Sequence, residues 1–128
     1  MRRRVIPAML SVFVIMVGAC GSGAAANTDR VELDEFSIMT GEPRWAPGRV
    51  TLRVENVGAR MHTLIITEDD GTVVAASDIL DPDGSADMEV FLQPGEYELT
   101  CRIVVESGDG QIFDHYEQGM RTAINVGA

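Results

Sequence analysis

The sequence predicts an all-β domain, an antiparallel β-sandwich of seven to eight strands. From Val31 onward apolar and polar residues alternate in short runs, the pattern of strands that bury one face. Gly, Pro, Asp and Asn separate these runs, as in "EPRWAPG" (42–48), "DPDG" (81–84) and "QPG" (93–95). No long stretch shows the helical period of about 3.6 residues. Short strands at this spacing within about 100 residues are typical of a sandwich or a barrel.

The expected strands follow the apolar runs in chain order. They are Val31–Met39, Arg49–Glu55, His62–Glu68, Thr72–Ser77, Ala86–Leu92, Glu96–Glu106, Gln111–Asp114 and Met120–Val126. Within each strand the period of two assigns side chains to faces. Cys101 shares its face with Leu99, and His62 shares its face with Leu64, so both are expected to point into the core. A buried thiol and a buried imidazole need a hydrogen-bond partner or a metal.

The first 19 residues are typical of an export signal. "MRRRVIPAMLSVFVIMVGAC" combines three arginines, a short apolar run and small residues before Cys20. The run is short for a membrane-spanning helix, which needs roughly 20 residues. Val17–Cys20 resembles the lipobox of bacterial lipoproteins, which implies a signal peptide at 1–19 and a lipidated Cys20. An uncleaved anchor helix, or an ordinary signal peptide with an incidental cysteine, is the alternative.

The rest of the chain divides into a tether and one domain. Residues 20–30, including "GSGAAANTD", are small and polar and predict a flexible tether. Residues 31–128 form the predicted domain. The chain carries 10 basic and 20 acidic residues, a formal net charge of -10, and loss of Arg2, Arg3 and Arg4 with the signal peptide leaves 7 against 20, or -13. Such a charge excludes nucleic acid as a partner and attracts basic proteins.

Few side chains can bind a soft metal, and they occur in a suggestive order. Apart from Cys20 the only cysteine is Cys101, and the only histidines are His62 and His115. A lone thiol in an exported protein calls for a partner or a metal. The methionines outside the signal peptide are Met39, Met61, Met88 and Met120. One thiolate, two imidazoles and a weak thioether are the donor set of a blue copper site, in which sulfur favours Cu(I) and imidazole suits both oxidation states.

Three motifs carry a family resemblance over roughly Val31 to Gly127. "NVGARMH" (56–62), "PGEYELTC" (94–101) and "HYEQGMRTAINV" (115–126) resemble the N-x-G-x-x-x-H, G-x-Y-x-x-x-C and H-x-x-x-G-M segments of cupredoxins such as plastocyanin and azurin. The resemblance implies a Greek-key β-sandwich with one type 1 copper. It also implies that the Thr63 backbone N–H donates toward the cysteine sulfur. The ligands that it implies are His62, Cys101, His115 and Met120.

The segment between the cysteine and the second histidine departs from that pattern. Thirteen residues, Arg102–Asp114, stand where plastocyanin and azurin have only a few. Two alternating runs in this segment flank "SGDG" (107–110), which predicts a β-hairpin. Pairing Glu106 with Gln111 would set Arg102 opposite His115. A hairpin would therefore return His115 to the neighbourhood of Cys101.

The resemblance and the export signal together imply a membrane-tethered electron carrier. It is expected to be exported and lipid-anchored at the outer face of the cell membrane, or in the periplasm or cell envelope. Its partners would be redox proteins with a basic docking patch, such as a cytochrome or an oxidase. His115 is expected near the surface, as the ligand through which electrons are exchanged.

Other functions are less well supported by the residues. Catalysis is not expected, because Cys101 lies mid-strand on the core face and no oxyanion hole or acid–base carboxylate pair accompanies it. The remaining alternatives are a copper-binding or delivery lipoprotein and a metal-free β-sandwich that acts as an interaction module.

Overall fold

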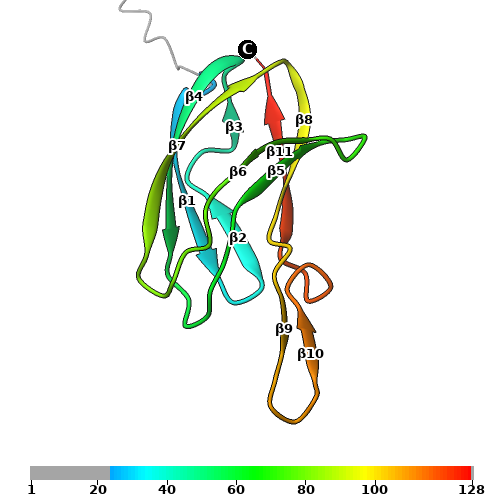
Figure 1. Ribbon diagram of the computed structural model, residues 1–128. Helices are drawn as coiled ribbons and strands as arrows, with labels where there is room; N and C mark the ends of the chain where they lie inside the picture. Colours follow the sequence, from blue (N-terminus) through cyan, green and yellow to red (C-terminus); the bar gives the residue numbers. More distant parts are fainter. Residues whose placement is uncertain (1–23, 128) are drawn as a thin grey trace, which may run out of the picture.

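The computed structural model describes residues 24–127, which form two facing layers of β-strands (Figure 1). One layer is a four-stranded sheet in the order β2-β1-β4-β7, and the other is a five-stranded sheet in the order β3-β11-β8-β5-β6. A two-stranded sheet, β10-β9, protrudes from one end. The eleven strands of this part of the chain are β1 (Thr28–Asp34), β2 (Ser37–Thr40), β3 (Arg44–Trp45), β4 (Gly48–Asn56), β5 (Ile65–Glu68), β6 (Val73–Ala76), β7 (Ser85–Leu92), β8 (Gly95–Thr100), β9 (Val104–Glu106), β10 (Ile112–Asp114) and β11 (Arg121–Val126).

The all-β prediction is confirmed, but the strands are more numerous and their pairing is mixed. β1 runs parallel to β4, and β3 runs parallel to β11, whereas the other pairs are antiparallel. Alternation within a strand shows which face is buried but not which strand lies beside it, so the parallel pairs could not be foreseen. The predicted signal peptide at 1–19 and Cys20 lie outside the described residues. Between residues 24 and 127, no helix is long and apolar enough to cross a membrane.

The predicted strand Val31–Met39 is wrong, because the chain turns back within it. β1 and β2 pair with Asp34 opposite Ser37, which leaves Glu35 and Phe36 as a two-residue turn. Phe36 has φ 60°, the left-handed conformation that such a turn needs and that few non-glycine residues adopt. The carboxyl side chain of Glu35 falls where alternation would place a core residue, after Val31 and Leu33. A strand that continued straight would have buried that charge in the core.

The core lies between the two sheets and is built from the inward faces of both. β4 contributes Val50, Leu52 and Val54, all fully buried, and β8 contributes Tyr97 and Leu99. Trp45 of β3 is also fully buried, and its indole N–H donates to the Asp29 Oδ2 atom at 2.8 Å. Every strand described here finds its pairing partners within residues 24–127. The inward faces of the two sheets form one cluster of buried apolar residues.

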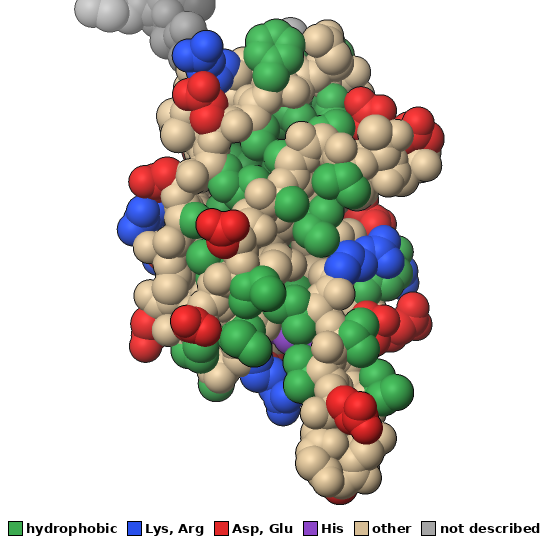
Figure 2. All heavy atoms as spheres, viewed as in Figure 1, with side chains coloured by type: hydrophobic (Ala, Val, Ile, Leu, Met, Phe, Trp, Pro, Cys, Tyr) green, Lys and Arg blue, Asp and Glu red, His purple; other side chains and the backbone are tan. Residues whose placement is uncertain are grey.

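The β9–β10 hairpin extends beyond the sandwich, as Figures 1 and 2 show. It confirms the predicted hairpin but not its register, because Glu106 lies opposite Ile112 rather than Gln111. The Gly110 N–H donates to the Ser107 carbonyl at 2.8 Å, and Gly110 has φ 82°. The Ser107 N–H also donates to the Gln111 carbonyl at 2.8 Å, so the loop consists of residues 108–110 and is one residue shorter than the predicted loop 107–110. The left-handed glycine permits this three-residue loop. The shift of one residue changes which face His115 occupies.

Candidate metal centre

Three of the predicted ligands meet at the end of the sandwich from which the hairpin protrudes. His62, Cys101 and His115 each offer a ligand atom, and these atoms lie within 4.8 Å of one another. All three side chains are fully buried. The Cys101 Sγ atom lies 3.5 Å from the His115 Nδ1 atom, and the two imidazole centroids are 5.0 Å apart. Soft sulfur and two imidazoles at this separation are a donor set for a transition metal.

His62 is positioned by the loop that follows β4. Asn56, almost fully buried, donates from Nδ2 to the Arg60 carbonyl at 2.7 Å and to the Leu80 carbonyl at 2.9 Å. Its Oδ1 atom accepts the Gly58 N–H at 3.0 Å. His62 and Leu80 then exchange backbone hydrogen bonds of 3.1 and 2.8 Å. One asparagine therefore closes the loop and delivers His62 to the core face, as the alternation predicted.

Cys101 follows the last residue of β8 and faces the segment that carries His62. The Thr63 N–H donates to the Cys101 Sγ atom at 3.5 Å, and the Thr63 hydroxyl lies 3.8 Å from the same sulfur. The hydrogen bond from Thr63 that the resemblance implies is thus present. Such donors stabilise negative charge on a metal-bound sulfur.

His115 and Met120 are joined by a tight turn. The Asp114 Oδ1 atom accepts the N–H groups of Tyr116 and Glu117 at 2.9 and 3.2 Å, which begins the turn. Gly119, at φ 100°, ends it. The Met120 N–H then donates to the His115 carbonyl at 3.0 Å, and the Met120 carbonyl accepts the Cys101 N–H at 3.2 Å. The backbone of Met120 is therefore hydrogen-bonded to both His115 and Cys101, and the Met120 side chain is fully buried.

The observed hairpin register explains why His115 points inward. The His115 N–H donates to the Ile103 carbonyl at 3.0 Å, which continues the pairing of Asp114 with Val104. Residues directly opposed in an antiparallel pair project to the same side, and Ile103 shares the side of Cys101. The predicted pairing with Arg102 would have turned His115 outward.

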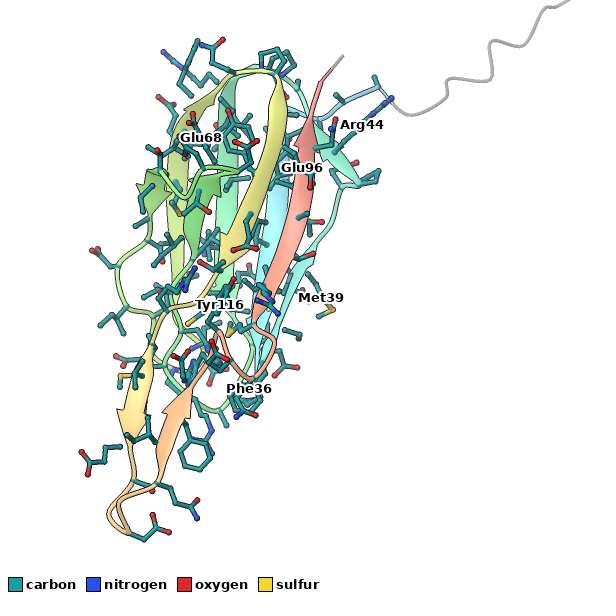
Figure 3. The ribbon with its side chains drawn as sticks, turned by 90° about the vertical axis from the view of Figure 1, so that its right-hand side faces the viewer. Phe36, Met39, Arg44, Glu68, Glu96 and Tyr116 are labelled. Carbon is teal, nitrogen blue, oxygen red and sulfur yellow. The ribbon has the colours of Figure 1, made fainter. Side chains whose placement is uncertain are left out.

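Tyr116 takes the outward position instead and packs against two arginines. The guanidinium carbon of Arg102 lies 3.6 Å from the Tyr116 ring centroid, and that of Arg121 lies 4.7 Å from it. Figure 3 shows Tyr116 beside the start of β11, in the half of the sandwich from which β9 and β10 protrude. Each member of this Arg102–Tyr116–Arg121 stack directly follows one of the predicted ligands Cys101, His115 and Met120. Cation–π contacts thus tie the three ligand segments together from outside.

The expectation that His115 lies near the surface is wrong. Its ring is fully buried, and Phe36 meets it edge-to-face with centroids 5.5 Å apart and planes 79° apart. Phe36 belongs to the β1–β2 turn, which Figure 3 shows at the end of the sandwich beside the hairpin. The turn that split the predicted first strand is what covers the histidine.

Burial also keeps both imidazoles neutral. Desolvation lowers the pKa of His62 below its ordinary value, and the Glu35 carboxylate opposes this only in part. Desolvation and the neighbouring His62 likewise lower the pKa of His115. A neutral imidazole has the free lone pair that metal binding requires. Both imidazoles are therefore already in their metal-binding protonation state at neutral pH.

Two residues beside the ligands were not identified from the sequence. The Glu35 Oε1 atom lies 3.6 Å from the His62 Nε2 atom, and Phe36 packs on His115. The signal was present as a break in alternation, because an acidic side chain stood at the inward position after Leu33. Asn56 and Gly58 belonged to a recognised motif, but only the structure shows what they contact.

Comparison with solved structures places the fold in a class, that of the cupredoxins. Auracyanin from the photosynthetic bacterium Roseiflexus castenholzii matches with a TM-score of 0.61 and 18% identity, over 82% of this chain and 100% of that chain. Auracyanin A from Chloroflexus aurantiacus, a "blue" copper protein, matches with a TM-score of 0.54 and 15% identity, over 78% of this chain and 99% of that chain. A reduced mutant of amicyanin matches with a TM-score of 0.52 and 15% identity, over 81% of this chain and 86% of that chain.

These likenesses show that the chain has the cupredoxin fold, as its three motifs predicted. No protein-family model and no curated protein sequence matches the chain.

Proposed function

We propose that this protein binds one type 1 copper ion and carries single electrons between redox proteins. The observation that carries the proposal is the convergence of His62, Cys101 and His115 within 4.8 Å, inside a fold shared with blue copper proteins. Both ring nitrogens of His62 are buried without a hydrogen-bond partner, a costly arrangement unless a ligand satisfies one of them. When bound, the copper ion supplies the change between Cu(I) and Cu(II).

Each ligand has a distinct role in this proposal. Cys101 supplies a thiolate, and Thr63 stabilises its negative charge. His62 binds through Nδ1, because its Nε2 atom faces Glu35, and His115 binds through Nδ1, which faces the sulfur. Met120 would supply a weak thioether ligand, and its backbone bonds to Cys101 and His115 hold it at that end of the sandwich. Rigid ligands that need not rearrange favour electron exchange over chemistry on a substrate, so we infer a carrier rather than an enzyme.

Burial of the ligands also bears on the alternative of copper delivery. Both imidazoles are fully buried, and Phe36 covers His115. A protein that hands its metal to another must expose at least one ligand to the recipient. The closed site therefore favours an electron carrier that retains its copper.

We further propose that the protein works outside the cytoplasm at a membrane surface. The basic, apolar and small-residue order of 1–19 supports export, and Cys20 would carry the lipid anchor, with 20–30 as tether and 31–128 as the domain. The net charge supports a redox partner, a cytochrome or an oxidase, with a basic docking patch.

Titration of the full chain with Cu(II) tests the proposal. Binding at the predicted site should produce an intense visible thiolate-to-copper band. Cys101→Ser should abolish the band, whereas Cys20→Ser is the matched control and should retain it. Reversible reduction with the metal retained is the expected behaviour of a carrier. Absence of the band from the wild-type chain, or its persistence in Cys101→Ser, would contradict the proposed site.

A further inference from the structure

The β1–β2 turn places a carboxylate beside one of the proposed ligands. Glu35 reaches from this turn to the loop after β4, where its Oε1 atom lies 3.6 Å from the His62 Nε2 atom. That separation is longer than a hydrogen bond, so the contact is one between charge and imidazole. The Glu35 side chain is 33% exposed, and the His62 side chain is fully buried. The Glu35 carboxylate is therefore partly exposed to solvent, whereas the His62 imidazole is shielded from it.

The surrounding backbone forms a receptor for this carboxylate. The Ala59 and Arg60 N–H groups donate to Glu35 Oε1 at 2.7 and 2.9 Å. Gly58 leaves room for it, because a Cβ atom at that position would lie 2.7 Å from the same oxygen. The backbone of Glu35 is also fixed, because its N–H donates to the Asp34 Oδ1 atom at 2.7 Å. Four residues thus direct one oxygen atom toward His62.

The turn itself is held in an unfavourable conformation. Phe36, the next residue, keeps φ 60° without being a glycine, while its ring packs against His115. Such conformations are unfavourable for a residue with a side chain and persist where the surrounding structure imposes them. The two residues of the turn contact the two imidazoles, one each.

We propose that Glu35 is a positioning residue that fixes the orientation of His62 and favours the oxidised state of the metal. This inference rests on the proposed function. A carboxylate beside Nε2 keeps the proton of the neutral imidazole on that nitrogen, which leaves the Nδ1 lone pair directed at the metal. Its negative charge also stabilises Cu(II) more than Cu(I), because the attraction grows with the charge of the ion.

Two substitutions separate these effects, and a third is the control. Glu35→Gln removes the charge but keeps an oxygen for the Ala59 and Arg60 N–H groups. Glu35→Ala removes the acceptor altogether. Glu32→Gln removes an equal charge from β1, where Glu32 is 30% exposed and pairs with Arg30 rather than with a ligand. All are compared in the full chain, with circular dichroism to verify folding.

The first readout is the reduction potential of the copper-loaded protein. Glu35→Gln should weaken Cu(II) binding about tenfold relative to Cu(I), which raises the potential by about 59 mV for one electron. Glu32→Gln should change it far less. If both variants shift the potential equally, Glu35 acts only through net charge and the inference fails.

The second readout needs no metal, so it separates this inference from the proposed function. Heteronuclear NMR of the metal-free chain reports which imidazole nitrogen of His62 carries the proton. The proton should reside on Nε2 in the wild type and in Glu32→Gln, and should redistribute in Glu35→Ala. An unchanged proton position in Glu35→Ala would overturn the inference. A wild-type chain that binds no copper would refute the proposed function while this measurement still stood.

Discussion

Replacement of Asn56 by alanine should both destabilise the fold and weaken the site. Asn56 is 2% exposed and makes three side-chain hydrogen bonds, to the Arg60 and Leu80 carbonyls and from the Gly58 N–H. Those bonds close the loop between β4 and His62. Alanine leaves the Arg60 carbonyl and the Gly58 N–H without this partner, whereas the Leu80 carbonyl keeps only its hydrogen bond from the His62 N–H. The β-carbon itself remains, so little apolar packing is lost.

The size of the effect follows from the number of bonds. Each hydrogen bond contributes about 1 kcal/mol net, and an unsatisfied buried group costs about 1–3 kcal/mol. Two of the three bonds are only partly buried, so water can restore some of the loss. The expected destabilisation is about 3 kcal/mol, which lowers the urea midpoint by about 2 M at a slope of about 1.5 kcal/mol/M. Copper affinity should fall by about 10–100-fold as His62 loses its support.

Urea unfolding of the metal-free protein, followed by copper titration of the folded variant, measures both effects. The matched control is Asn125→Ala, which removes an exposed asparagine from β11 and should change stability by no more than about 0.5 kcal/mol. The reasoning is refuted if Asn56→Ala shifts the midpoint no further than this control. It is equally refuted if stability falls as expected while copper affinity stays at the wild-type value.

Three further predictions concern the other side of the site and its protonation. Tyr116→Leu should lower the free energy of unfolding by about 1–2 kcal/mol and broaden the visible thiolate-to-copper band. Tyr116→Phe keeps both cation–π contacts and should keep most of the stability. Equal losses of stability in the two variants would rule out the stack as the cause. Gly119→Ala should lower the free energy of unfolding by about 1–2 kcal/mol, because alanine is strained at φ 100° even though space is free there. Gly108→Ala is the control: that position is equally uncrowded but has no left-handed φ, so the free energy of unfolding should change little. The metal-free protein should lose stability as pH falls below about 6.5, because the unfolded chain binds protons at His62 and His115 at a higher pH than the folded chain does. Identical unfolding curves at about pH 7.5 and about pH 5.5 would contradict this prediction.

Local pattern was sufficient to predict the inward faces of Cys101 and His62, which the structure confirms. Side chains in a strand alternate with a period of two wherever the strand lies, so Cys101 and His62 could be placed on inward faces from their neighbours alone. The scarcity of histidine and cysteine then left few combinations. The motifs also indicated the cupredoxin fold, which the solved structures confirm.

The arrangement around the ligands depended on contacts that a local pattern does not contain. The hairpin register depends on Gly110, whose left-handed conformation permits the shorter loop. The shorter loop places His115 on the opposite face from the one predicted. The parallel pairing of β1 with β4 joins segments far apart in the chain. Burial of His115 arises because the turn at Phe36, 79 residues earlier, packs on it. Which residues can bind a metal is a property of the chain's local chemistry, whereas the burial and surroundings of those residues result from non-local packing.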